Sequence, residues 1–202
     1  MKRLLTVVVA SLFSLSVFAA DPPNTESIEI QNSMDKTVST ELMKHMGPVE
    51  AHKNLNPMVG NFKYTLKYWM APNSKPEESK GTSKGKWILG GRFVQQDVKG
   101  KSMGKEFLGT STMGYDSMRE QYQTSWIDNM SNHMMIGTGT FDTSSKTFTE
   151  SGDFSCVMTN DKNRTYRTEI KIGDKSTYTY SMFLKDKEGK EFKSMEINYT
   201  RL

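Results

Sequence analysis

Asp128, Ser131 and His133 form the one local grouping of the residue types that nucleophilic catalysis uses. A hydrolytic triad needs its base within about 3 Å of the nucleophile, in a geometry that a third residue orients. Here all three residues fall on one short stretch, and the chain contains no Gly-x-Ser-x-Gly motif. We therefore interpret the grouping as a polar loop and predict no catalytic residues.

Methionine beside histidine, in His45-Met46 and His133-Met134, is the second chemical pattern. Thioether and imidazole ligands suit Cu(I), but methionine also fills irregular cores. Because the spacing is not diagnostic of a metal site, we predict no metal and no cofactor. The single cysteine, Cys156, excludes an intramolecular disulfide and a cysteine-based zinc site.

Large aromatic side chains with a few polar neighbours form the third pattern, which is typical of small-molecule sites. The alternative is a packed core, because side chains alone can fill a small barrel. The residues that we predict to bind a ligand are Trp87, Phe93, Gln95, Trp126, Asp128, His133, Arg167, Glu169 and Tyr180.

Alternating hydrophobicity predicts strands over most of the chain beyond residue 60. Phe62, Tyr64, Leu66 and Tyr68 share one parity and polar residues share the other, which indicates a half-buried strand. Further strands are expected near residues 81–89, 92–98, 106–114, 121–127, 133–141, 147–154, 165–172, 176–184 and 192–201. Turn residues such as Gly90-Gly91 separate them.

Ten strands with no long helix between them predict antiparallel hairpins and an all-β fold. A sandwich and a closed barrel both fit this pattern. We favour a meandering closed barrel, because closure removes the exposed strand edges that promote aggregation.

One or two short helices are expected to precede the barrel. Asp35 can cap a helix that ends at Gly47-Pro48, and Pro48 can open a second one that Pro57 ends. We expect residues 21–47 to form a flexible arm with a short helix, and residues 48–202 to form the barrel domain.

The first twenty residues have the pattern of a cleaved signal peptide. Lys2 and Arg3 precede an apolar run, and Ala19-Ala20 supplies small residues for cleavage. The run is too short to cross a bilayer as a helix, so we expect no stable membrane anchor and a periplasmic or secreted protein. The net charge is only +4, and Lys2 and Arg3 contribute two of these charges, so nucleic acid is not an expected partner.

The segments 47–53, 59–62, 87–93, 113–116, 126–131 and 189–201 together resemble the bacterial domain-of-unknown-function family 1579. The most distinctive segment is Trp87-Ile88-Leu89-Gly90-Gly91-Arg92-Phe93. The resemblance implies a secreted lipocalin-like barrel. In such barrels an aromatic residue of the first strand stacks on an arginine of the last strand. That pair would be Phe62 and Arg201 here, although this chain has Gly60-Asn61-Phe62 where the usual pattern is Gly-x-Trp.

The leading functional hypothesis is a secreted, non-enzymatic barrel that binds a small apolar or amphipathic molecule in its interior. Two alternatives remain open: a hydrolase or isomerase that acts inside the cavity, and a solid barrel that interacts with other envelope components. The sequence does not define the oligomeric state.

Overall fold

The computed structural model describes residues 25–174 and 176–202. The predicted signal peptide, residues 1–20, lies outside them. The chain divides into two units, with the boundary in the sequence between Glu41 and Leu42.

Two helices precede the strands. The α-helix α1 spans Thr25–Met46, and the 3-10 helix η1 spans Glu50–Met58. The first helix therefore begins well before the cap predicted at Asp35. Instead of capping, Asp35 accepts a hydrogen bond from Gln31 one turn earlier in the same helix, at 2.9 Å. No proline or glycine interrupts the chain between Thr25 and Gly47, so nothing in this stretch ends the helix earlier.

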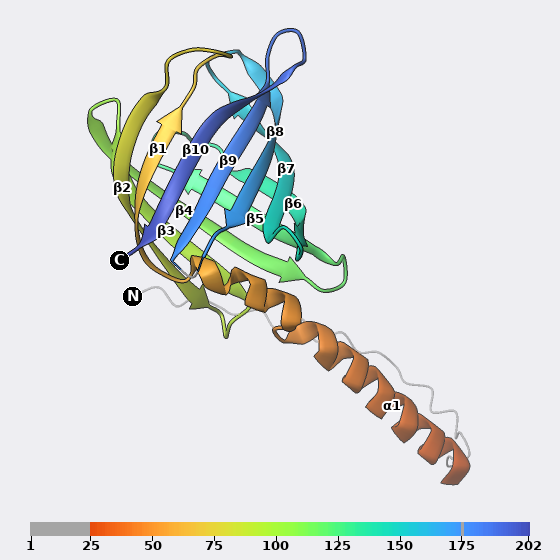
Figure 1. Cartoon of the computed structure of the whole chain (residues 1–202). Helices are drawn as coiled ribbons and strands as arrows, with labels where there is room; N and C mark the ends of the chain where they lie inside the picture. Colours follow the sequence, from red (N-terminus) through yellow and green to blue (C-terminus); the bar gives the residue numbers. More distant parts are fainter. Residues whose placement is uncertain (1–24, 175) are drawn as a thin grey trace, which may run out of the picture. The chain divides into compact units, whose positions relative to one another are not determined.

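Ten antiparallel strands follow and close into a barrel, as predicted (Figure 1). Each strand pairs with its neighbours in the chain, and β1 pairs with β10 to complete the ring. The strands are β1 (Gly60–Tyr68), β2 (Glu77–Ile88), β3 (Phe93–Ser102), β4 (Lys105–Asp116), β5 (Gln121–Asp128), β6 (Met135–Asp142), β7 (Thr147–Cys156), β8 (Asp161–Ile172), β9 (Thr177–Lys185) and β10 (Glu191–Arg201).

One end of the barrel is closed by η1. Leu55 of η1 is fully buried and Met58 nearly so, and both join the main apolar core. Tyr122 of β5 donates a hydrogen bond to the Ala51 carbonyl at 2.8 Å and accepts one from Asn54 at 2.9 Å. We call this the closed end, and the opposite end, where β1 ends at Tyr68, the open end.

Arg201 fastens the last strand to the first at the closed end. Its guanidinium lies 4.7 Å from the centre of the Phe62 ring, and it donates hydrogen bonds to the carbonyls of Val59 and Pro57 at 2.7 and 3.2 Å. A side chain at Gly60 would collide with this guanidinium, because a Cβ there would lie 2.1 Å from Nη1. The implied pairing of Phe62 with Arg201 is therefore present.

Candidate ligand-binding site

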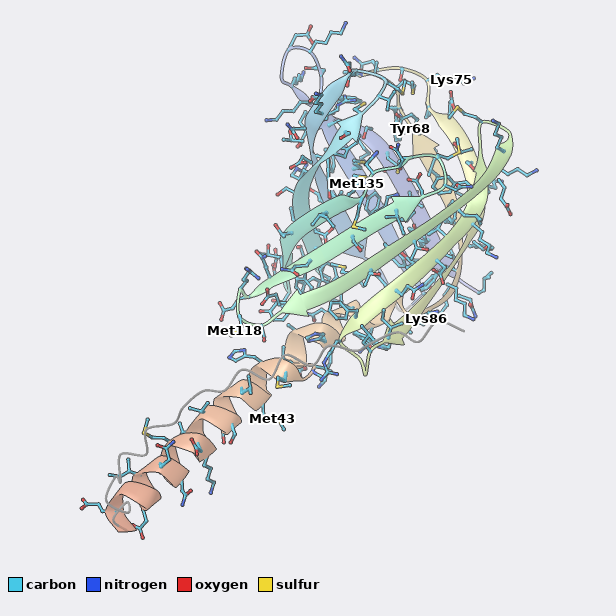
Figure 2. The ribbon with its side chains drawn as sticks, turned by 180° about the vertical axis from the view of Figure 1, so that it is seen from behind. Met43, Tyr68, Lys75, Lys86, Met118 and Met135 are labelled. Atoms are coloured by element: carbon cyan, nitrogen blue, oxygen red, sulfur yellow. The ribbon has the colours of Figure 1, made fainter. Side chains whose placement is uncertain are left out.

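The interior of the barrel differs between its two halves. Near the closed end most inward side chains are buried, for example Phe62, Phe148 and Tyr199. Toward the open end Tyr166, Met182 and Leu184 are buried as well. The other large inward side chains there are half-buried: Leu66, Tyr68, Phe107, Trp126, Met135, Phe154, Tyr180, Met195 and Ile197. Tyr68 lies at the opposite end of the barrel from Lys86 and Met118, and Met135 lies between the two ends (Figure 2).

Glu150 of β7 faces the interior between the two halves. It is 4% exposed, and its neighbours on the same face of β7, Phe148 and Phe154, belong to different apolar clusters. The Thr124 hydroxyl donates a hydrogen bond to Oε1, and the Thr168 hydroxyl donates one to Oε2 at 3.5 Å. Burial raises the pKa of the Glu150 carboxyl, and the two threonine hydrogen bonds oppose this shift only in part.

Two glycines of β6 make room for the Glu150 side chain. A Cβ on Gly139 would lie 2.7 Å from the Cα and 2.8 Å from the Cγ of Glu150. A Cβ on Gly137 would lie 2.9 Å from the Tyr166 hydroxyl and 3.8 Å from Oε2 of Glu150. Larger residues at either position would displace the carboxyl or the tyrosine, so this part of the wall is shaped around them.

Two tyrosines lie close to the Glu150 carboxyl. Burial, together with the nearby Glu150 charge, raises the pKa of Tyr166 to about 12 and also raises the pKa of Tyr180. Tyr180 is nevertheless half-buried rather than sealed. The carboxyl therefore sits beside aromatic side chains at the base of the open half.

Sequence reasoning missed Glu150, although the signal was present. The predicted strand 147–154 places Glu150 on the same face as Phe148, Gly152 and Phe154. An acidic residue on the apolar face of a strand is unusual, because burying an unpaired carboxylate is costly. That position alone marks Glu150 as a candidate.

Three of the predicted ligand-binding residues point inward in the open half or at its rim. Trp126 packs against Phe107, with ring centres 6.2 Å apart, and donates a hydrogen bond to Asp128 at 2.9 Å. Asp128 also accepts hydrogen bonds from the backbone of Met130 and Ser131, so it holds the β5–β6 turn. Tyr180 lies deeper, beside Glu150.

Trp87 and His133 lie apart from this group. Trp87 is at the closed end, where its indole donates a hydrogen bond to Asn56 of η1 at 3.1 Å. His133, in the β5–β6 loop, stacks on Phe154 with ring centres 6.0 Å apart. His133 therefore borders the open half, whereas Trp87 belongs to the contact between η1 and the barrel.

Two predicted residues of β3, Phe93 and Gln95, lie on the outer face. The inward residues of this strand are Val94 and Val98, which are buried. Phe93 covers Gly114, and Gln95 donates a hydrogen bond to Asp97 at 2.8 Å. Neither side chain reaches the interior.

Arg167 and Glu169 of β8 are also on the outer face, because the inward residues of this strand are Tyr166 and Thr168. Arg167 stacks on Phe183 at 4.1 Å, and its Nη2 lies 2.7 Å from Glu191 in one salt bridge. A second salt bridge joins it to Glu169. Four of the predicted ligand-binding residues therefore do not line the interior: Phe93, Gln95, Arg167 and Glu169.

Arg164, Cys156 and Tyr68 approach one another at the open end. Arg164 lies 3.5 Å from the Cys156 sulfur and donates a weak hydrogen bond to the Lys185 carbonyl at 3.4 Å. Burial alone would raise the pKa of the Cys156 thiol, but hydrogen bonds from Thr159 and Arg164 outweigh it, and the pKa is lowered. Burial and the nearby Cys156 raise the pKa of Tyr68, and Arg164 opposes this shift.

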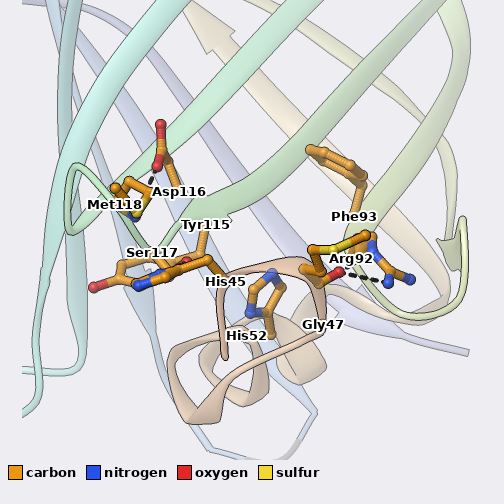
Figure 3. A pocket seen from close by; sticks show the side chains of 10 residues that line it. His45, Gly47, His52, Arg92, Phe93, Tyr115, Asp116, Ser117 and Met118 are labelled. Atoms are coloured by element: carbon orange, nitrogen blue, oxygen red, sulfur yellow. Dashed lines mark hydrogen bonds between the residues drawn. The ribbon is translucent and has the colours of Figure 1, made fainter. Parts of the chain in front are cut away.

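A depression of about 170 Å³ lies at the closed end (Figure 3). It is lined by His45, Met46, Gly47, His52, Arg92, Phe93, Tyr115, Asp116, Ser117 and Met118. His52 accepts a hydrogen bond from the Val49 backbone at 3.0 Å, and Arg92 donates one to the Met46 carbonyl at 2.8 Å. Burial lowers the pKa of His52, although hydrogen bonds with the backbone of Val49 and Arg92 act in the opposite direction. Arg92 therefore holds the end of α1, and the His52 ring, which caps the start of η1, packs edge-on against Tyr115 with ring centres 5.9 Å apart.

A second depression, of about 500 Å³, lies on the rim of the open end. It is lined by Trp69, Ala71, Pro72, Asn73, Asp186, Lys190, Glu191, Phe192 and Lys193. Its acidic residues are engaged, because Asp186 accepts hydrogen bonds from the backbone of Glu188 and Lys190, and Glu191 pairs with Arg167. Phe192 connects this depression with the apolar cluster of the open half.

Within residues 25–174 and 176–202, no group of three or more His, Cys, Asp or Glu side chains is placed to hold a metal ion. Among the helices of that same part of the chain, none combines the length and the apolar character needed to span a bilayer.

Comparison with known proteins gives a family and a fold. Residues 47–201 match the profile of a family described as "Protein of unknown function (DUF1579)". No curated protein matches the chain.

Among solved structures, the chain is similar to Rv2717c from M. tuberculosis, with a TM-score of 0.57 and 12% identity over 76% of this chain and 98% of that one. It is also similar to the S-type phycobiliprotein lyase CPES from Guillardia theta, with a TM-score of 0.55 and 10% identity over 77% and 94% of the two chains. At these identities the comparisons show a shared fold.

Proposed function

The chain belongs to the DUF1579 family of proteins of unknown function, and we propose that its barrel binds a small apolar or amphipathic molecule in the open half of the interior. The observation that carries the proposal is the group of half-buried apolar side chains that face the interior in the open half, among them Leu66, Phe107 and Trp126. They lie beside a smaller buried cluster of Tyr166, Met182 and Leu184.

Half-buried apolar walls favour a ligand because covering them removes apolar surface from water. Each Å² of apolar surface removed is worth about 25 cal/mol, so covering roughly 200 Å² would contribute about 5 kcal/mol before the costs of binding. Apolar walls with few polar groups are the general character of small-molecule sites. In this barrel the polar groups are Glu150, Thr124 and Thr168.

The structural neighbours are compatible with this proposal. One protein of the same fold is named a phycobiliprotein lyase, so the fold serves in at least one protein for more than structural support. Identity of 10% transfers no residue roles, and the proposal rests on this chain's own interior.

We also propose that the protein is exported and that residues 1–20 are removed. The support is the charged start, the apolar run and the small residues at Ala19-Ala20. Intact-mass measurement of protein from an extracytoplasmic fraction should give a chain that starts at Asp21. A full-length chain that starts at Met1 would contradict export by this route.

Binding can be tested with N-phenyl-1-naphthylamine, a neutral apolar fluorophore whose emission rises in apolar surroundings. The wild type should bind it saturably at one site. Met135→Trp adds bulk to the inward face of β6, whereas Ile136→Trp adds the same bulk on the outer face, where Ile136 is 51% exposed. We expect Met135→Trp to weaken binding at least about tenfold, or about 1.4 kcal/mol, and Ile136→Trp to bind like the wild type.

Circular dichroism and urea unfolding check that both variants remain folded. The proposal would be wrong if the wild type showed no saturable binding. Equal affinities of the two folded tryptophan variants would also reject the interior as the site.

A further inference from the structure

We propose that the ligand carries a positively charged amino or ammonium group that pairs with Glu150 inside the barrel. This inference rests on the proposed binding function and names the chemical class of the ligand. It follows from the placement of Glu150, from the groups that surround it, and from the absence of a cationic partner among the described residues.

The neighbours of Glu150 are arranged to support a carboxylate. Thr124 and Thr168 donate hydrogen bonds to different oxygens of the carboxyl group. Hydrogen-bond donors stabilise the charged form of a carboxyl, and the same hydroxyl oxygens can accept the proton of the neutral acid. The site can therefore hold a carboxylate, but it provides no positive charge to compensate it.

No cation compensates Glu150 within residues 25–174 and 176–202. None of the salt bridges in that range includes it, and no Lys, Arg or His contributes to its pKa. The nearest inward-facing cation on the adjacent strand, Arg164, is held at the rim by Cys156 and the Lys185 carbonyl. An isolated buried charge is strongly unfavourable, so a ligand cation would supply the missing partner.

Aromatic side chains lie near the Glu150 carboxyl. Tyr166 and Tyr180 both lie near enough for the Glu150 charge to raise their pKa, and Trp126 lies on the same inner wall. Aromatic faces attract cations by about 0.5–1 kcal/mol at exposed sites and about 2 kcal/mol when water is excluded. A carboxylate beside aromatic rings favours an amine with an apolar tail over an alcohol or an acid of the same length.

Binding of an ammonium group would displace the carboxyl proton. In the empty barrel, burial favours the protonated carboxyl. On binding, the ligand stays positively charged, Glu150 becomes a carboxylate, and the proton passes to the solvent. Charge and atoms balance in this exchange, which predicts that amine binding releases protons at pH values below the raised pKa of Glu150, where the empty barrel holds the proton.

The experiment compares octylamine, octanol and octanoate, which have the same chain and different head groups. Each is titrated calorimetrically into the wild type, Glu150→Gln and Asp153→Asn. Asp153 is an exposed carboxylate on the opposite face of β7 and serves as the matched control. N-phenyl-1-naphthylamine binding is measured in parallel.

For the wild type at neutral pH we expect octylamine to bind at least about tenfold more tightly than octanol, or about 1.4 kcal/mol, and octanoate to bind most weakly. The overall positive charge of the protein opposes this order, so a preference for the amine must come from the site. Titration in buffers with different ionisation enthalpies, repeated at several pH values, should show proton release where the empty barrel holds the Glu150 proton. Glu150→Gln should lose both the preference and the proton release, and Asp153→Asn should keep both.

Each result has a defined meaning. If the fluorophore and octanol bind but octylamine has no advantage, the amine inference fails and the binding proposal stands. The same holds if Glu150→Gln, folded and binding the fluorophore, keeps the preference. If neither the fluorophore nor any octyl compound binds, both proposals fail.

Discussion

Glu150 is the residue at which the barrel departs most clearly from an efficient core. A carboxyl that is 4% exposed between two apolar clusters loses its hydration and regains only two threonine hydrogen bonds. Burial of a polar group without full compensation costs roughly 1–3 kcal/mol by mutational measurements. Such a cost is commonly found where function requires the group.

The first prediction concerns the pH dependence that Glu150 imposes on stability. Its pKa in the folded chain is raised above the reference value of 4.5. At pH values between 4.5 and the raised pKa, the folded state holds more protons than the unfolded state. The free energy of unfolding therefore decreases as pH rises through this window. Glu150→Gln should remove this decrease and be more stable than the wild type at pH 8 by about 1–3 kcal/mol.

Urea unfolding at pH 5 and pH 8 measures this difference. His52 has the opposite effect, because its lowered pKa makes stability increase with pH below 6.5. Comparing variant and wild type at the same pH cancels the His52 contribution. Asp153→Asn, exposed on the outer face of the same strand, is the control and should change stability by less than about 0.5 kcal/mol. A Glu150→Gln variant less stable than the wild type at pH 8 would contradict the argument.

Among the elements, η1 determines which end of the barrel is open. Its backbone and side chains bind strand residues through Tyr122 and Trp87, and Leu55 fills the end of the core. Because these contacts cover one end of the barrel, the ligand that we propose would have to enter from the other. The nine-residue helix that precedes the barrel therefore blocks one of the two routes to the interior.

The second prediction tests this role of η1. Leu55→Ala removes a side chain that is 0% exposed and should reduce the free energy of unfolding by about 2–5 kcal/mol. Lys53→Ala changes an exposed residue of the same helix, whose salt bridge with Glu50 is also exposed, and should cost less than about 0.5–1 kcal/mol. Equal, small losses for the two variants in urea unfolding would show that η1 is not part of the cooperative core.

For the whole molecule, strand number and antiparallel order could be predicted because the period-two pattern recurs between turn residues. Closure was an inference from edge avoidance, and the β1–β10 pairing confirms it. The predicted start of α1 at Asp35 was wrong, because a residue that can cap a helix can equally lie within one, as Asp35 does.

The interior face was harder to predict than the strands. In β3 both parities carry apolar residues, Phe93 on one and Val94 on the other, so hydrophobicity alone does not choose between them. In β8, Arg167 was expected inside, but pairing with Glu191 and stacking on Phe183 hold it outside. These partners come from β10 and β9, and their proximity depends on strand register, which the sequence does not specify.

The last prediction concerns closure of the barrel. Arg201 of β10 stacks on Phe62 of β1 and donates hydrogen bonds to the carbonyls of Pro57 and Val59 at the end of η1. A single side chain therefore connects the last strand, the first strand and the closed end. Arg201→Ala removes a cation–π contact and two charge-assisted hydrogen bonds and should reduce the free energy of unfolding by about 2–4 kcal/mol.

Arg201→Lys keeps the charge but not the planar group that reaches both carbonyls while stacking on the ring, so it should recover less than half of that loss. The matched control is Lys193→Ala, an exposed residue of β10 whose partner Glu196 is three residues away on the same strand. Urea unfolding of the three variants measures these differences. If Arg201→Ala were no more destabilising than Lys193→Ala, the closure would depend on the β1–β10 backbone pairing and not on this side chain.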